Sequence, residues 1–216
     1  MQGNHTRNFL RLLAGLAVTL LAACAGPGGS YGPGAGVFDT VIVDAGHGGH
    51  DTGARAVSGQ REKYLALDTS RKLAAILRSK GLRVIETRTA DTFIPLSRRA
   101  EIANRTGGAI FVSIHYNWTR RTAARGLEVY YYSPRSRRLA ANIQSQIRRA
   151  YPTENRGIKT ARFYVLRNNK RPAVLCELGF LSNPADNRYA QNPTYRKRLA
   201  ERIADGILAE RAGAAP

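Results

Sequence analysis

The sequence predicts a single α/β domain of three layers, in which helices cover both faces of a mostly parallel, mixed β-sheet. Short runs of β-branched and other apolar residues, typical of buried strands, alternate along the chain with longer segments of helical periodicity. No internal repeat is visible, and 216 residues with 43% hydrophobic content are enough to bury one core. Strands that alternate with helices in this way predict the α/β class.

Five apolar runs are predicted to form strands, and three of them lead into polar residues. The runs cover residues 41–43, 82–87, 109–115, 126–132 and 173–177. His47 follows the first run, His115 ends the third and Glu177 ends the last. Because open α/β sheets bind ligands at the carboxyl ends of their strands, we expect these side chains to belong to a site.

Four segments have apolar residues on one helical face and are predicted to be helices. They cover residues 62–80, 96–104, 134–151 and 193–207. Gly81 is expected to end the first helix, while Asn192 and Pro193 form a typical helix start. The other face of the third helix is basic and is expected to be solvated or to lie on an anionic surface. Its arginines are Arg135, Arg137, Arg138, Arg148 and Arg149.

The first 23 residues resemble a bacterial lipoprotein signal peptide. Arg7 and Arg11 precede an apolar run, residues 12–23, that is too short to span a bilayer as a mature helix. Small residues directly before Cys24 resemble a lipobox, in which the cysteine carries lipid and becomes the first mature residue. An ordinary signal cut after Ala23, or an uncleaved anchor, is the alternative.

The remaining chain is divided into a tether, one domain and a short tail. Residues 24–37 are rich in glycine and proline and are expected to be a flexible tether with a reach of roughly 20 Å. Residues 38–211 form the predicted domain, and residues 212–216 a flexible tail. We expect an exported lipoprotein, held on a membrane and facing the periplasm or cell wall. Ala25 is compatible with sorting to an outer membrane.

Charge and cysteine content limit the partners. The formal net charge is +19, so the surface is expected to attract polyanions. The chain has neither a zinc-finger cysteine pattern nor an aromatic RNA-binding run, so no nucleic-acid partner is expected. The expected anionic partners are cell-wall polymers and lipid headgroups. With Cys24 lipidated, only Cys176 remains, which excludes an intramolecular disulfide.

A glycine-rich stretch follows the first predicted strand. Residues 40–54 read T-V-I-V-D-A-G-H-G-G-H-D-T-G-A. The glycines would let the backbone turn and approach a ligand without a Cβ in the way. No lysine-serine pair follows them, which argues against a phosphate-binding loop. Taken alone, the stretch is equally compatible with a strand and a turn that holds an incidental histidine.

Two histidines and two glutamates together indicate metal-dependent hydrolysis. His47 and His115 with one carboxylate are a known ligand set for a catalytic zinc, and Glu62 stands near the first strand. A carboxylate that does not bind the metal is needed to take a proton from water and pass it to the leaving nitrogen. Glu177 suits that role, since a charge at the end of so apolar a strand must be paired or used.

Five separated motifs resemble the zinc-dependent N-acetylmuramoyl-L-alanine amidases of the type 3 family, in the family's order, across residues 40–207. They are V-D-A-G-H-G-G-H-D-T-G-A, R-E-K-Y-L-A-L, S-I-H-Y-N, A-R-G-L-E-V-Y-Y and C-E-L-G-F-L-S-N. The resemblance implies one Zn²⁺ bound by His47, Glu62 and His115, with Glu177 acting as base and then acid. It implies hydrolysis of the amide between muramic acid and L-alanine in peptidoglycan.

Other residues match recurring family positions without a direct chemical role. They are expected to support the zinc ligands or the fold, and they are Asp44, Arg88, Arg99, Asn104 and Asn117. His50 is expected to be a loop residue near the rim of the site.

Several relatives carry a long insertion after the H-x-N motif, with a helix that blocks the zinc until an activator removes it. Here only residues 118–124 separate Asn117 from Arg125, which is too short for such a helix. We therefore expect an open site, no activator and a monomer. The alternatives are a zinc carboxypeptidase or endopeptidase acting on the stem peptide, and a non-catalytic wall-binding lipoprotein.

Overall fold

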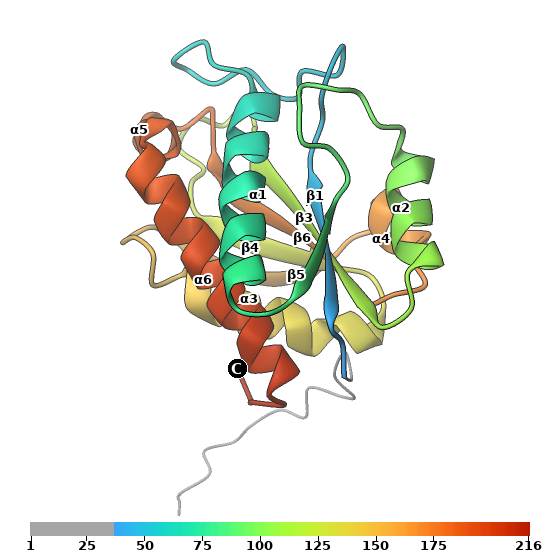
Figure 1. Ribbon diagram of the computed structural model, residues 1–216. Helices are drawn as coiled ribbons and strands as arrows, with labels where there is room; N and C mark the ends of the chain where they lie inside the picture. Colours follow the sequence, from blue (N-terminus) through green and yellow to red (C-terminus); the bar gives the residue numbers. More distant parts are fainter. Residues whose placement is uncertain (1–36) are drawn as a thin grey trace, which may run out of the picture. The chain divides into compact units, whose positions relative to one another are not determined.

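A six-stranded mixed sheet forms the centre of the fold, in the order β2-β1-β3-β6-β4-β5 (Figure 1). Strands β2, β1, β3 and β6 are parallel, β4 is antiparallel to β6, and β5 is parallel to β4. The strands are β1 (Thr40–Ala45), β2 (Arg83–Glu86), β3 (Ala109–Asn117), β4 (Leu127–Tyr131), β5 (Asn155–Thr160) and β6 (Ala173–Phe180). The predicted α/β class with a mostly parallel, mixed sheet is confirmed.

Helices cover both faces of this sheet. α1, α3 and α6 pack on one face over the larger apolar core, and α2 and α4 pack on the other over a smaller one (Figure 1). The helices are α1 (Glu62–Ser79), α2 (Leu96–Arg105), α3 (Arg137–Ile147), α4 (Tyr164–Arg167), α5 (Pro184–Gln191) and α6 (Pro193–Arg211). Val41 and Val43 face the larger core and Ile42 the smaller one, so β1 is apolar on both sides.

The computed structural model describes residues 37–216 of the protein. The expected signal peptide, Cys24 and almost all of the tether lie outside the described residues and stay predictions. In the tail, Asn142 Nδ2 donates a hydrogen bond to the carbonyl oxygen of Ala214. Among residues 37–216, no helix combines the length and the apolar character that crossing a bilayer requires.

Two strands run further than the apolar pattern predicts. β3 continues past His115 to Asn117, and β6 continues past Glu177 to Phe180. The prediction that these residues end their strands is therefore wrong. Both strands lie inside the sheet, where pairing with a neighbour on each side extends the strand beyond the apolar run. Their polar side chains thus project from paired strands.

The third predicted helix is too long at both ends. A single 3₁₀ turn, Pro134–Ser136, precedes α3, and α3 ends at Ile147. Tyr151 lies beyond the helix and packs against Tyr189 instead. The proline that follows Tyr151 disfavours helical backbone at that residue, which explains the early end.

Three elements were not expected from the sequence. β5 reads N-R-G-I-K-T and has one apolar residue, so it has no alternating pattern to recognise. α4 is a single turn, and α5 has eight residues. α5 did carry a readable signal, because Asn183 caps it by accepting hydrogen bonds from two backbone amides and Pro184 follows in the first turn.

The close packing of α6 on α3 depends on a glycine. A Cβ at Gly206 would lie 2.5 Å from the Cα of Ile143. We expect Gly206→Ala to lower the free energy of unfolding by about 1–2 kcal/mol, since the cost of overpacking exceeds the gain of roughly 1 kcal/mol in helix propensity. Urea denaturation measures this. Gly107→Ala, which meets no atom within 4 Å, is the near-neutral control, and equal stability of the two variants would contradict the packing.

Candidate active site

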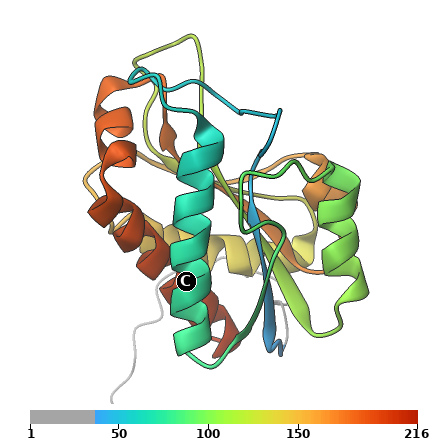
Figure 2. The same cartoon turned by 45° about the horizontal axis from the view of Figure 1, so that its top comes forward.

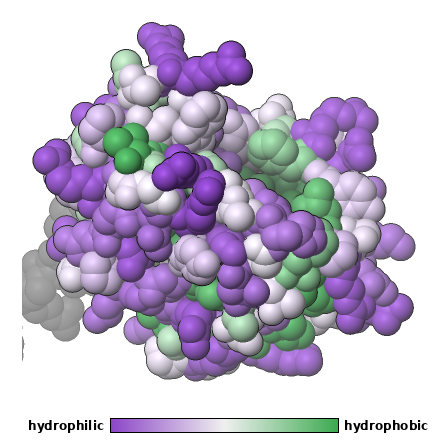
Figure 3. Space-filling view, turned by 90° about the horizontal axis from the view of Figure 1, so that it is seen from above, coloured by the Kyte–Doolittle hydropathy of each residue, from purple (hydrophilic) through white to green (hydrophobic). Residues whose placement is uncertain are grey.

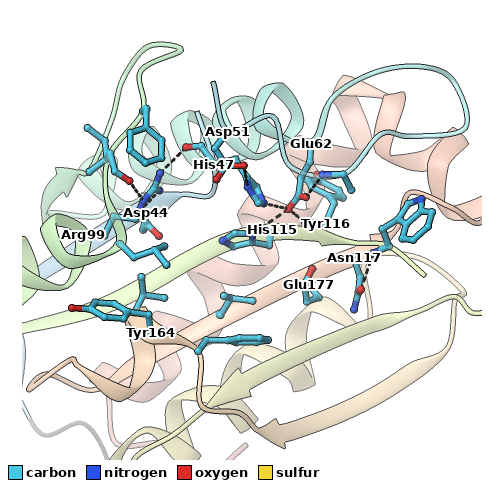
Figure 4. Close-up of a pocket in the computed structure, with 18 residues that line it drawn as sticks. Asp44, His47, Asp51, Glu62, Arg99, His115, Tyr116, Asn117, Tyr164 and Glu177 are labelled. Carbon is cyan, nitrogen blue, oxygen red and sulfur yellow. Dashed lines mark hydrogen bonds and ion pairs between the residues drawn. The ribbon is translucent and has the colours of Figure 1, made fainter. Parts of the chain in front are cut away.

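His47 follows β1 in a strained backbone conformation. Its φ of 60° lies in the left-handed region that residues other than glycine rarely adopt. Arg99 Nη2 donates to the carbonyl oxygen of His47 at 2.7 Å, and the backbones of Gly48 and Asp51 exchange two hydrogen bonds. Nδ1 of the ring lies 2.9 Å from Asp51 Oδ1, so Nε2 is directed toward Glu62 (Figure 4). The loop therefore fixes both the place and the orientation of the imidazole.

Glu62, the first residue of α1, lies between the two histidines. Its Oε1 is 3.1 Å from Nε2 of His47 and 3.1 Å from Nδ1 of His115. The backbone amides of Ala54 and Tyr116 donate to its two oxygens at 2.9 and 3.0 Å. Possible ligand atoms of the two histidines and Glu62 all lie within 4.8 Å of one another. We call these three residues the His–Glu–His cluster.

The charges of the His–Glu–His cluster depend on one another. Burial alone would raise the pKa of Glu62, but hydrogen bonds from His115 and His47 lower this pKa far below its usual range. Burial opposes the charged form of His47, yet Glu62 and then Asp51 raise the pKa of His47 above its usual value. Glu62 is therefore ionised at neutral pH and can serve as an anionic ligand.

Two glycines of the loop leave room for the side chains of the cluster. A Cβ at Gly46 would lie 2.3 Å from the ring of His115, and a Cβ at Gly53 would lie 2.7 Å from both His47 and Glu62. The sequence suggested that these glycines admit a ligand. The structure shows that the space at these two positions is filled by protein side chains, whose close packing any larger residue would prevent.

Glu177 lies on β6, opposite His115 in the strand register and next to the cluster (Figure 4). The residue is partly exposed to a cavity, whereas its Oε2 atom is buried and has no hydrogen-bond partner within residues 37–216. Burial raises the pKa of Glu177 well above its usual value, and the negative charges of Glu62 and Glu128 raise it further. A carboxyl group in such surroundings holds a proton more readily than an exposed one.

Asp44 and two buried arginines hold the backbone that leads to His47. Asp44 accepts a hydrogen bond from Arg99 at 2.7 Å, and two hydroxyl groups, of Thr87 and Ser113, also donate to it. Arg88 and Arg99 donate to the carbonyl oxygens of residues 45–47. All three side chains thus support the loop from behind rather than joining the cluster.

The remaining expected residues lie in different places. Asn117 lines the cavity and donates a hydrogen bond to Glu128. Asn104 does not line the cavity: it joins the end of α2 to residues 168–170 through two hydrogen bonds. His50 stacks on Phe93 with the ring centres 4.0 Å apart and lies outside the cluster.

A cavity of about 590 Å³ contains the cluster and Glu177. Its other side is apolar, and Figure 3 shows such residues gathered on the side of α2 and α4. These lining residues include Phe93, Ile94, Leu96, Phe163 and Val165. Residues 118–126, which join β3 to β4, form no helix, and Trp118 is 49% exposed at the rim. Figure 2 shows this connection and the loop after β1 at the same edge of the sheet.

Sequence reasoning missed three acidic or basic residues at the site. Asp51 orients His47, and its place four residues after the histidine was the only available signal. Lys63 donates to the carbonyl oxygen of Gly49 and to Asp91, which in turn accepts from the amide of Gly49. Glu128 lies beside Glu177 in the register of β4 and β6. Lys63 and Glu128 stand in two of the family-like motifs, but no local pattern indicated their roles, because their partners are distant in the chain.

The fold and the site define a class of protein, namely an α/β domain with a candidate metal centre beside the carboxyl group of Glu177, as in metal-dependent hydrolases. Residues 41–209 match the family model described as N-acetylmuramoyl-L-alanine amidase. The chain belongs to this family.

Relatives in sequence and in structure support this family assignment. N-acetylmuramoyl-L-alanine amidase LytC of Bacillus subtilis is 34% identical over 176 residues, which are 80% of this chain but only 35% of LytC. The structure of amidase AmiC2 of Nostoc punctiforme has 40% identity and a TM-score of 0.76, covering 82% of this chain and 97% of AmiC2. The CwlD amidase of Clostridioides difficile, solved in complex with the GerS lipoprotein, has 32% identity and a TM-score of 0.78. The match covers 81% of this chain and 99% of CwlD.

The burial of Glu177 predicts a stability that depends on pH. The folded pKa lies above the unfolded value of about 4.3, so the folded protein loses stability as the pH rises from the unfolded pKa to the folded one. We expect metal-free Glu177→Gln to be more stable than the metal-free wild type at pH 7 and equally stable near pH 4. Each unit of pKa difference corresponds to about 1.4 kcal/mol.

Denaturation in the presence of a chelator at both pH values measures this difference. Glu201→Gln, a change on the exposed side of α6, is the control and should leave the stability unaltered at either pH. A Glu177→Gln variant that is no more stable than the wild type at pH 7 would contradict the expectation.

Proposed function

We infer that the protein is an N-acetylmuramoyl-L-alanine amidase, which hydrolyses the amide bond between muramic acid and the L-alanine of the stem peptide in peptidoglycan. One observation carries this inference: the His–Glu–His cluster and Glu177 share one cavity in a domain that matches the amidase family over residues 41–209. Products of the reaction would be the glycan and a stem peptide with a free amino terminus.

We propose that the cluster holds one Zn²⁺. Two imidazoles and one ionised carboxylate form a donor set that suits a zinc ion with one coordination position left open. Asp51 orients one of these ligands, His47. When bound, Zn²⁺ lowers the pKa of a coordinated water and polarises a carbonyl group. His47, Glu62 and His115 would hold it.

Glu177 would move the proton of the reaction. As a carboxylate it takes a proton from the attacking water, whose oxygen forms a bond to the lactyl carbonyl carbon. It then gives that proton to the nitrogen of L-alanine as the carbon–nitrogen bond breaks. The Oε2 of Glu177, which is buried without a hydrogen-bond partner within residues 37–216, and the raised pKa of this residue support the double role, because a carboxyl group whose charged form is disfavoured accepts a proton readily.

We further propose an exported lipoprotein, with lipid on Cys24 and a tether of residues 24–37 that leaves the domain near a membrane, facing the periplasm or the wall. The signal-like residues 1–23 support this. We propose a monomer that acts without an activator. The short, helix-free connection between β3 and β4 supports action without an activator.

Digestion of purified peptidoglycan separates the candidate activities. We expect the isolated protein to release intact stem peptides and peptide-free glycan without any added partner. Glu177→Gln should lower kcat about 10²- to 10⁴-fold while zinc content and wall binding are unchanged. Shortened peptides still attached to sugar would indicate a carboxypeptidase or endopeptidase instead, and wall binding without any hydrolysis would indicate a binding protein.

Metal analysis tests the ligand set. Each of His47→Ala, Glu62→Ala and His115→Ala is expected to lose most of the bound zinc. Asp51→Asn should weaken zinc affinity about 10- to 100-fold, because Asp51 only orients a ligand. His50→Ala is the matched control, since His50 lies in the same loop but outside the cluster. Full zinc content in any of the three alanine variants would overturn the assignment of that residue.

A further inference from the structure

The face of the sheet that carries Glu177 is only partly covered by helices. On this face α2 and α4 contact β1, β3 and β6, whereas α3 packs against β4 and β5 from the opposite face. On the side of Glu177, Tyr130 is only partly buried, and the side chain of Lys159 stays 37% exposed. An accessible surface therefore extends from Glu177 across β4 and β5.

Glu128 is buried under this surface and is not needed by the proposed reaction. It is 1% exposed and lies directly opposite Glu177 in the antiparallel register of β4 and β6. Four side chains donate hydrogen bonds to its carboxylate, those of Asn117, Tyr130, Arg156 and Lys159. Burial alone would raise the pKa of Glu128, but Lys159, Arg156 and Tyr130 lower it, so this carboxylate is ionised.

Two cations lie over aromatic rings along β4 and the residues that follow β4 and β5. Lys159 lies over the ring of Tyr130, and Arg162 lies over the ring of Tyr132 at 6.0 Å. Arg156 is shared between Glu128 and Glu154, whereas Lys159 contacts Glu128 alone among acidic groups of the described chain. Arg162 forms no ion pair within residues 37–216. Arg162 therefore carries a positive charge that no acidic side chain of the described residues neutralises, and Lys159 and Arg156 share the single charge of Glu128.

The strand spacing places this charge at a definite distance from the reaction. Lys159 on β5 pairs with Tyr130 on β4, and Tyr130 pairs with Leu175, two residues before Glu177 on β6, so the backbones of Lys159 and Glu177 lie about 12 Å apart. An extended peptide covers about 12 Å in three to four residues. The side chain of Lys159 shortens this span, because its Nζ contacts Glu128, directly opposite Glu177. The opposite side of the cavity is lined mainly by apolar residues such as Phe93 and Phe163. The charged part of a substrate is therefore drawn toward β4 and β5.

We propose that Lys159 and Arg162 form a subsite for a free carboxylate near the start of the stem peptide, and that Glu128 is the positioning residue that holds Lys159 there. This inference rests on the proposed amidase function and adds its substrate preference. Glu128 also fixes Asn117 at the edge of the cavity, so one buried carboxylate links the subsite to the site of hydrolysis.

Two synthetic muramoyl peptides test the proposal. They differ only at the second residue of the peptide, which carries a free carboxylate in one substrate and the neutral amide in the other. The wild type is expected to favour the free carboxylate about five- to tenfold in kcat/KM, the range that partly exposed charge pairs and charged hydrogen bonds supply. Lys159→Met and Arg162→Met should each reduce this preference by raising KM for the acidic peptide, with kcat and the amidated peptide little changed.

Glu128→Gln separates positioning from folding. This variant keeps the shape and a hydrogen-bonding group but lacks the charge that holds Lys159, so it should raise KM for the acidic peptide and not for the amidated one, with zinc content unchanged. Because the charge of Glu128 also raises the pKa of Glu177, any change in kcat should be the same for both peptides. A merely structural role would instead raise KM for both peptides. Lys80→Met is the matched control, because α1 starts at Glu62 and its 18 residues place Lys80 about 27 Å from the cluster.

The outcomes are distinct for the two proposals. If the wild type cleaves both peptides at the muramoyl–alanine bond without a preference, or if Lys159→Met affects both peptides equally, the carboxylate subsite is wrong and the amidase function stands. If the wild type with full zinc content cleaves neither peptide at that bond, the proposed function itself fails.

Discussion

The site depends on one interaction, the burial of an ionised Glu62 between His47 and His115. A buried carboxylate is stable only when several donors surround it, and here two imidazoles and two backbone amides do so. These donors come from the loop after β1 and from β3, while Glu62 itself begins α1. One side chain therefore joins three segments of the chain, and the geometry of the His–Glu–His cluster is built into the packing of the fold.

The strained backbone of His47 shows how rigidly this geometry is held. A positive φ at a residue other than glycine persists only where the surroundings over-determine it. Arg99 and Arg88 bind the carbonyl oxygens of residues 45–47, and Asp44 neutralises Arg99 within the core. Such a preorganised loop spares a bound metal from having to order its own ligands.

Two glutamates on neighbouring strands show how the environment assigns different tasks to the same side chain. Glu128 accepts four hydrogen bonds from donors that include two cations, which lowers its pKa. Glu177, directly across the register, has a buried oxygen with no partner among residues 37–216, and its pKa is raised. The first is suited to hold other groups in place and the second to transfer a proton.

The sequence by itself determined the α/β class, most of the strands and helices, and the expectation that His47 and His115 reach one edge of the sheet. These depend on local periodicity and on motifs, which a single chain displays directly. Only the tertiary structure decided that β5 completes the sheet, that α2 and α4 leave β4 and β5 accessible on one face, and that Glu128 lies against Glu177. The physical reason is that strand register and buried hydrogen bonds join residues far apart in the chain, and no local pattern records them.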